Sequence, residues 1–279
     1  MNASENNDWS FTLSNLYALG NHFADFLKKR RSPFLLFVPL RGAYPVYLAI
    51  MKNISMRVES GEIPKEKLNK MKIVFLPASI SDYTMSGQMM RDLSTTLDKH
   101  KFTKNTDIVY FDTYGSGTAM IHSIPDLEKE ICNRIGKKPM VNIFAAGIVD
   151  SRLEPPLVDF ENNILSQLAL PGKKNLGILL GKTVSVPICN MWEDTSLEQG
   201  VQVGTNSDDR GKIFKNLHSI ISTYGGESPK EYFKQKLSMH GKFFPNKLKD
   251  AVGITFGHRE TANRIMVGIE RMHLAKLKK

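Results

Sequence analysis

The sequence predicts an α/β protein with a mostly parallel sheet flanked by helices. Short runs of β-branched, aromatic and other apolar residues recur along residues 1–190, as buried parallel strands require. Amphipathic or apolar helical patterns separate these runs, which is typical of strands joined by crossover helices. Turns containing glycine, proline or acidic residues follow several of the runs.

The first half of the chain predicts three strands. Ser32-Pro33 ends the first helix, and a tight turn with Arg41 and Gly42 follows the first strand. The expected order is a helix at 9–31, a strand at 34–38, a helix at 44–53, a strand at 73–76, a loop at 77–87, a helix at 89–100 and a strand at 107–111.

The second half continues the alternation and then becomes polar. Gly136 ends a helix, Pro155-Pro156 marks a break, and beyond Thr205 long polar stretches have helical spacing. The expected order is a helix beginning at 119–124, a helix at 127–135, a strand at 141–146, a helical segment at 160–170, extended pieces at 178–180 and 183–188, and a last helix at 260–279.

Composition favours a cytoplasmic protein. The 279 residues are 41% hydrophobic and 24% charged, and only two are cysteines, which excludes a disulfide framework. The polar N-terminus does not have the pattern of a signal peptide. No apolar run approaches the ~20 residues that a membrane-spanning helix needs, so no membrane partner is expected.

The positive charge is concentrated near the C-terminus. Residues 1–206 hold 23 Lys and Arg against 21 Asp and Glu, whereas residues 207–279 hold 15 against 7, a net charge of +8 out of +10. We therefore expect an α/β domain at 1–206 and a basic, mainly helical extension at 207–279. The extension could contact a polyanion such as nucleic acid, although solvated lysine-rich helices also explain it.

The stretch 106–120 has the pattern of an anion-binding turn. Asp112 follows the apolar run 108–111, and a helix can begin just after Gly115-Ser116-Gly117-Thr118. In such a turn, backbone N–H groups and the helix N-terminus bind phosphate, and glycines allow a close approach. An ordinary strand-to-helix connection explains the same residues equally well.

Other polar residues are expected at the same edge of the sheet. Parallel strands bring their carboxyl ends together, and ligands bind there. This edge should hold Arg41, the 79–83 loop, Asp112 with its turn, Asp150 and Glu193-Asp194. One arginine, several acids and a phosphate-type turn predict a site for a phosphorylated metabolite bound with Mg²⁺.

Competing motifs fit less well. A dinucleotide fingerprint needs a small residue where Met120 stands, and the P-loop-like run 177–183 is one residue short between its glycines. The sequence that a nucleophile elbow requires is missing, so a hydrolase triad has no support.

The run 108–118, Ile-Val-Tyr-Phe-Asp-Thr-Tyr-Gly-Ser-Gly-Thr, resembles the PRPP-binding loop of type I phosphoribosyltransferases. The run 34–49 is similar to that family's first strand and pyrophosphate loop, and the loop after 73–76 stands where the family has a flexible catalytic loop. The resemblance covers roughly residues 30–190. It departs at Thr113, where the family has a second acid, and the turn is two residues shorter than the family pattern.

The resemblance implies a role for each matching position. Asp112 would contact the ribose and Mg²⁺, and Gly115, Ser116, Gly117 and Thr118 would hold the 5′-phosphate. Arg41 and Gly42 would face the pyrophosphate. Tyr83, Asp150, Trp192 and Glu193 are candidates near the base.

Two functions follow from these residues. The first is a phosphoribosyltransferase-like enzyme that binds PRPP or a nucleotide 5′-monophosphate and transfers or releases a base at ribose C1 with Mg²⁺. The alternative is a non-catalytic regulator on the same fold, which senses a nucleotide or binds nucleic acid. Dimers are common in the resembled family, so a homodimer is also expected.

Overall fold

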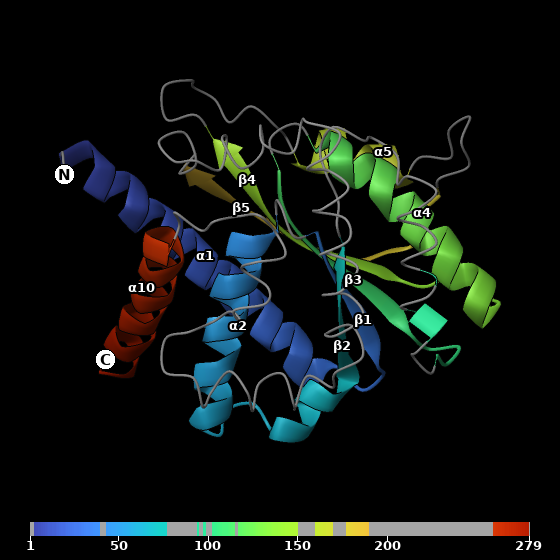
Figure 1. The fold of residues 1–279 in the computed structure, drawn as a ribbon, viewed down its shortest axis with the longest axis horizontal. Coiled ribbons are helices and arrows are strands. Elements are labelled where there is room, and N and C mark those ends of the chain that lie inside the picture. The colour runs from blue at the N-terminus through green and yellow to red at the C-terminus, as the bar shows by residue number, and fades with distance from the viewer. Residues whose placement is uncertain are drawn as a thin grey trace, which may run out of the picture.

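Five parallel strands form the centre of the computed structural model (Figure 1). The structure describes residues 3–39, 43–76, 94, 97–98, 102–114, 117–149, 160–169, 177–189 and 259–278. The strands are β1 (Phe34–Pro39), β2 (Met71–Leu76), β3 (Asp107–Tyr114), β4 (Val141–Val149) and β5 (Leu180–Cys189). Their order across the sheet is β2-β1-β3-β4-β5, and every pair is parallel. The predicted α/β class is confirmed.

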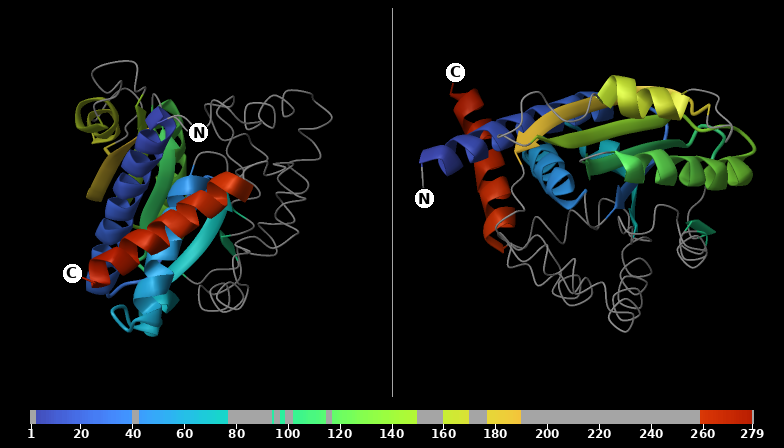
Figure 2. Two further views of the ribbon diagram at one scale, coloured as in Figure 1. Left: turned by 90° about the vertical axis from the view of Figure 1, so that its left-hand side faces the viewer. Right: turned by 90° about the horizontal axis from the view of Figure 1, so that it is seen from above.

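Helices cover both faces of the sheet. α1 (Ala3–Lys29), α2 (Tyr44–Glu59) and α10 (Arg259–Leu277) pack together on one face, and Figures 1 and 2 show them away from α4 (Thr118–Ile135). The opposite face is covered by α4 with the helical turns η2 (Phe160–Leu165) and α5 (Ser166–Ala169). A 3₁₀ helix, η1 (Lys65–Lys70), leads into β2.

Strand alternation divides the apolar side chains between two cores. Phe111 and Phe144 face α1, where the ring of Phe23 packs edge-on against both at centroid distances of 5.0 and 5.1 Å. Tyr110 and Ile143, one residue along each strand, face α4 instead. Strands buried on both faces account for the continuous apolar runs in the sequence.

Several predicted boundaries differ from the structure. Asp112 lies inside β3, which continues to Tyr114, and was not expected within the strand. The helices expected at 119–124 and 127–135 form the single helix α4, with Pro125 inside it, because its apolar positions share one buried face on both sides of the proline. The two extended pieces expected after 177 form the single strand β5.

The remaining elements follow the predictions more closely. α1 and α2 are longer than expected, and the segment expected to be helical at 160–170 is helical through η2 and α5. Ser94, Leu97 and Asp98, the described residues of the helix expected at 89–100, are helical. The 77–87 loop and the proposed boundary at 206 lie outside the described residues. Within the described part of the chain, no helix has the length and apolarity to cross a membrane.

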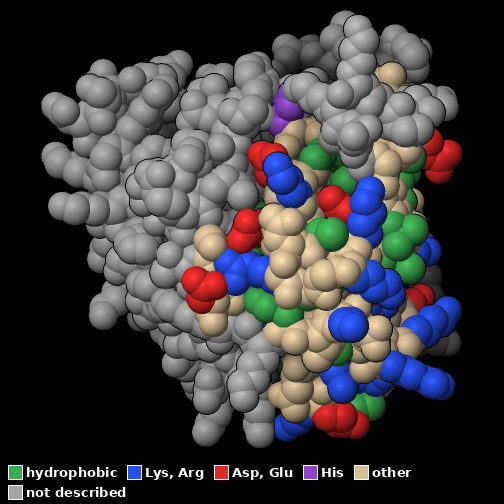
Figure 3. Space-filling model, turned by 90° about the vertical axis from the view of Figure 1, so that its right-hand side faces the viewer, with side chains coloured by type: hydrophobic (Ala, Val, Ile, Leu, Met, Phe, Trp, Pro, Cys, Tyr) green, Lys and Arg blue, Asp and Glu red, His purple; other side chains and the backbone are tan. Residues whose placement is uncertain are grey.

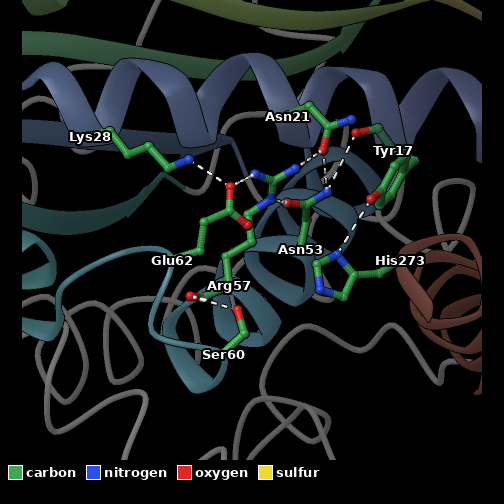
Figure 4. A network of polar contacts seen from close by, with 8 residues as sticks. All are labelled: Tyr17, Asn21, Lys28, Asn53, Arg57, Ser60, Glu62 and His273. Carbon is green, nitrogen blue, oxygen red and sulfur yellow. Dashed lines mark hydrogen bonds and ion pairs between the residues drawn. The ribbon is translucent and has the colours of Figure 1, made fainter. Parts of the chain in front are cut away.

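A buried polar network joins α1 to α2 (Figure 4). Arg57, only 6% exposed, donates from Nε to Asn53 Oδ1 at 2.8 Å and from Nη2 to Asn21 Oδ1 at 2.5 Å. Its third nitrogen pairs with Glu62, which also pairs with Lys28 at 2.6 Å. Every nitrogen of the guanidinium therefore has a partner, as a buried cation requires.

Replacing Arg57 with methionine is expected to lower the free energy of unfolding by about 2–4 kcal/mol, because the acceptors on Asn53 and Asn21 lose their charged donor. Arg271→Met, at an exposed position of α10, is the matched control and should change stability by less than about 0.5 kcal/mol. Urea unfolding of both variants measures the difference. Equal effects would show that the network does not stabilise the packing of α1 on α2.

Candidate functional site

The strand order places a switch point between β1 and β3. The chain leaves β1 through α2 on one face of the sheet and leaves β3 through α4 on the other. The paired register of β1 with β3 ends at Phe37–Tyr110, whereas β3 remains paired with β4 as far as Tyr114–Gly147. Ligands of open parallel sheets bind at such a point, outside the carboxyl ends of the strands.

Two helix N-termini flank this switch point. α2 begins after β1, and α4 begins after β3, so the partial positive charge of each helix lies at the carboxyl edge. Within the described residues, neither helix has a side-chain hydrogen bond capping its N-terminus or an acidic residue in its first turn. First-turn backbone N–H groups of a helix are suited to an anion, although Pro45 in the first turn of α2 has none.

Asp112 is a buried acid at this edge, with only 4% of its surface exposed. Its Oδ1 accepts a hydrogen bond from the backbone N–H of Thr113 at 2.8 Å. Burial raises the pKa of Asp112 to about 8, against the smaller opposing effect of that hydrogen bond. In the absence of a ligand, the carboxyl group is therefore largely protonated at neutral pH.

Thr113 does not act as a second group beside Asp112. Consecutive residues of a strand point to opposite faces, so Asp112 shares the α4 face with Tyr110 and Thr113 faces α1 and α2. Thr113 Oγ1 is buried and has no hydrogen-bond partner among the described residues. The ribose contact that the resemblance assigns to two acids would therefore depend on Asp112.

Gly117 has a structural reason to be glycine. Its φ of +74° lies in the left-handed region, and it forms the N-cap of α4. A Cβ atom at Gly117 would lie 2.2 Å from Cδ1 of the buried Ile164 in η2. The space beside this glycine is thus filled by Ile164, so its small size is explained by packing and is no evidence for a phosphate.

Tyrosine hydroxyls on the α4 face were not predicted to belong to the site. Tyr110 Oη bonds Ser123 Oγ on α4 at 2.8 Å, and Tyr114 Oη bonds Ser185 Oγ on β5 at 2.6 Å. Phe160 stacks on Tyr114 with a centroid distance of 5.5 Å. The alternation of Tyr110, Asp112 and Tyr114 was the signal that could have placed all three on one face.

Only some of the predicted site residues are described. Asp112 and Gly117 lie together at the carboxyl end of β3, and Thr118 is the first residue of α4. The other predicted residues lie outside the described part of the chain, namely Arg41, Gly42, Tyr83, Gly115, Ser116, Asp150, Trp192 and Glu193.

Asp112 is the one described residue assigned to Mg²⁺. Among the residues that the structure describes, no group of three or more His, Cys, Asp or Glu side chains could hold a metal ion. Mg²⁺ is nevertheless often bound by one or two carboxylates together with substrate phosphates and water. The buried carboxyl group of Asp112 fits that arrangement if a bound ligand supplies the phosphates.

Comparison of the chain with models of known families, with curated proteins and with solved structures gave no match.

Proposed function

We propose that the protein binds PRPP or a nucleotide 5′-monophosphate at the switch point between β1 and β3. The observation that carries this proposal is the buried Asp112 at the carboxyl end of β3. Among the described residues, neither α2 nor α4 has a side-chain cap at its N-terminus. The helix termini suit a phosphate, and the carboxylate suits a ribose hydroxyl. The resemblance of 34–49 and 108–118 to phosphoribosyltransferases supports the same ligand class.

The reaction that fits this ligand is transfer or release of a nitrogenous base at ribose C1. The turn after Tyr114 and the N-terminus of α4 would hold the 5′-phosphate, and ionised Asp112 would accept hydrogen bonds from the ribose hydroxyls. Arg41 would bind the pyrophosphate. When bound, Mg²⁺ would neutralise part of the phosphate charge.

A non-catalytic regulator is the second candidate, favoured by the position of Thr113. Its side chain faces away from Asp112, so binding of the ribose diol would depend on a single acid. Contact with nucleic acid would depend on residues 207–279, which carry most of the net charge. On the face shown in Figure 3, the described Lys and Arg side chains are interspersed with Asp and Glu.

Two measurements distinguish these functions. Calorimetry with Mg²⁺-PRPP, AMP, GMP, UMP and ribose 5-phosphate tests the binding site, and at least one of these compounds is expected to bind. Incubation with PRPP and a panel of bases then tests catalysis, and the enzyme is expected to release pyrophosphate. Folded protein that binds none of the compounds would exclude both the enzyme and the nucleotide sensor.

Binding without pyrophosphate release would favour the regulator. A gel shift across a salt series tests its nucleic-acid branch, because phosphate contacts give a steep dependence on salt. Lack of a shift at low salt would exclude that branch.

A further inference from the structure

The C-terminal helix α10 is held against α1 and α2 by apolar and polar contacts. Ile265, Met266 and Ile269 are buried in the core that α1 and α2 share. Gly268 lies against Leu13 of α1, because a Cβ atom there would come within 2.5 Å of the leucine side chain. Figure 2 shows α10 crossing beside both helices.

Polar contacts occur along the same interface. Near the N-terminus of α10, the guanidinium of Arg264 lies 5.2 Å from the centre of the ring of Trp9 in α1. Lys52 of α2 pairs with Glu270 at 2.9 Å. Near the C-terminal end of the helix, His273 is 6% exposed, and its Nδ1 lies 3.4 Å from Tyr17 Oη.

His273 is a titratable group enclosed by this interface (Figure 4). The groups that face it are Tyr17 from α1, Arg57 from α2, Glu62 from the turn after α2, and Lys276 from its own helix. Burial, together with the charge of Arg57, lowers the pKa of His273, and the charge of Glu62 opposes this effect only in part.

A proton on His273 would place a second cation beside the buried guanidinium of Arg57. The acid whose charge acts on His273 is Glu62, which already pairs with Arg57 and Lys28. Its carboxylate is therefore shared, and it cannot give the imidazolium a partner of its own. Moving the imidazole into water removes both the desolvation and the repulsion, and this requires α10 to leave α1 and α2.

We propose that His273 makes the docking of α10 dependent on pH. The helix docks more strongly while the imidazole is neutral, and protonation of the imidazole makes the released state more frequent. The pKa of His273 is lower when the helix is docked than when it is released, so docking is strongest above about pH 6.5, the ordinary value. It weakens as the pH falls below that value. Release uncovers the apolar surface of α1 and α2 that Ile265, Met266 and Ile269 cover.

Hydrogen exchange of the full chain at pH 7.5 and pH 5.5, corrected for the intrinsic rate, measures the release. The opening frequency of peptides from α10 is expected to be as much as about tenfold higher at pH 5.5 than at pH 7.5. This is the limit for one proton with an ordinary pKa near 6.5. Peptides from α4, on the other face, serve as the internal reference and should keep their protection. Trp9 fluorescence in a Trp192→Phe background gives a second readout, because Trp9 contacts α10 through Arg264.

Three variants test the assignment to His273. His273→Gln is uncharged at both pH values and should abolish the pH dependence, whereas His273→Lys should make α10 open more often than the wild type at pH 7.5 and also remove the pH dependence. His22→Gln changes an exposed histidine of α1 and should behave as the wild type. The proposal is overturned if wild-type α10 opens equally at both pH values or if the pH dependence persists in His273→Gln. Loss of protection in α4 together with α10 would also overturn it, by showing global unfolding.

Discussion

Replacing Gly117 with alanine is expected to lower the free energy of unfolding by about 3 kcal/mol or more. The backbone at φ +74° costs roughly 1–2 kcal/mol for a residue with a Cβ atom. The added Cβ would also lie 2.2 Å from Ile164, and relieving such a clash costs about 1–3 kcal/mol. Urea unfolding, with midpoint and slope both fitted, measures the loss.

Gly136→Ala is the matched control for Gly117→Ala. Gly136 ends the same helix with φ +68°, but a Cβ atom there would meet nothing within 4 Å. Gly136→Ala should lose only the stability that backbone strain at positive φ accounts for, about 1–2 kcal/mol. Adding Ile164→Ala to Gly117→Ala should recover the part that arises from the clash, which a double-mutant cycle isolates. Equal losses at Gly117 and Gly136 would show that Ile164 moves aside at no cost.

This packing limits what the glycine pattern can indicate about function. The run Gly115-Ser116-Gly117-Thr118 has the composition of a phosphate-binding turn. The contact between Gly117 and Ile164 is long-range, and no local pattern around residue 117 reveals it. A glycine needed for a left-handed N-cap and a glycine needed for a ligand have the same appearance in a sequence.

The fold class could be predicted because buried strands and helices have distinct periodicities. Four of the strands were predicted from short apolar runs such as 34–38 and 108–111, which parallel strands buried on both faces require, and the fifth was predicted as two extended pieces. The end of β3 was misplaced because Asp112 is polar, and a polar residue was expected to end the strand. Pairing with β4 continues through Tyr114 and keeps Asp112 extended and buried.

The strand order and the polar network could not be derived from local patterns. The switch point depends on β3 pairing on the far side of β1 from β2, a choice made by packing across the whole sheet. Arg57 and Asn53 are one turn apart on α2, but Asn21 comes from α1, and the residue types of all three are typical of a helix surface.

Asp112→Asn is expected to stabilise the protein and to weaken its binding of PRPP. The folded pKa of Asp112, about 8, lies above the unfolded value of 3.8, so its favourable contribution is full below pH 3.8 and is lost as the pH rises through 8. At pH 7 the cost is on the order of 4 kcal/mol, which asparagine would not incur. The variant should therefore gain most of this stability at pH 7, and its stability should vary less between pH 4 and pH 8.

The same substitution removes the anion proposed to contact the ribose. A hydrogen bond to a charged group contributes about 1.5–3 kcal/mol, so PRPP should bind at least roughly tenfold more weakly. Inorganic phosphate has no ribose and should bind as well as to the wild type or slightly better. Asp25→Asn, at an exposed position of α1, is the control and should change neither quantity. Urea unfolding and calorimetry measure the two effects.

Opposite signs for stability and binding are what separate a functional acid from a structural one. If the carboxyl group only supported the fold, replacing it would lower the stability of the protein. The replacement would also change the affinities for PRPP and for inorganic phosphate by the same factor. If Asp112→Asn is more stable and its PRPP affinity is undiminished, the buried acid destabilises the protein without contributing to ligand binding. The proposed ribose contact would then be wrong. A less stable variant would instead show that the ionised side chain has a stabilising partner.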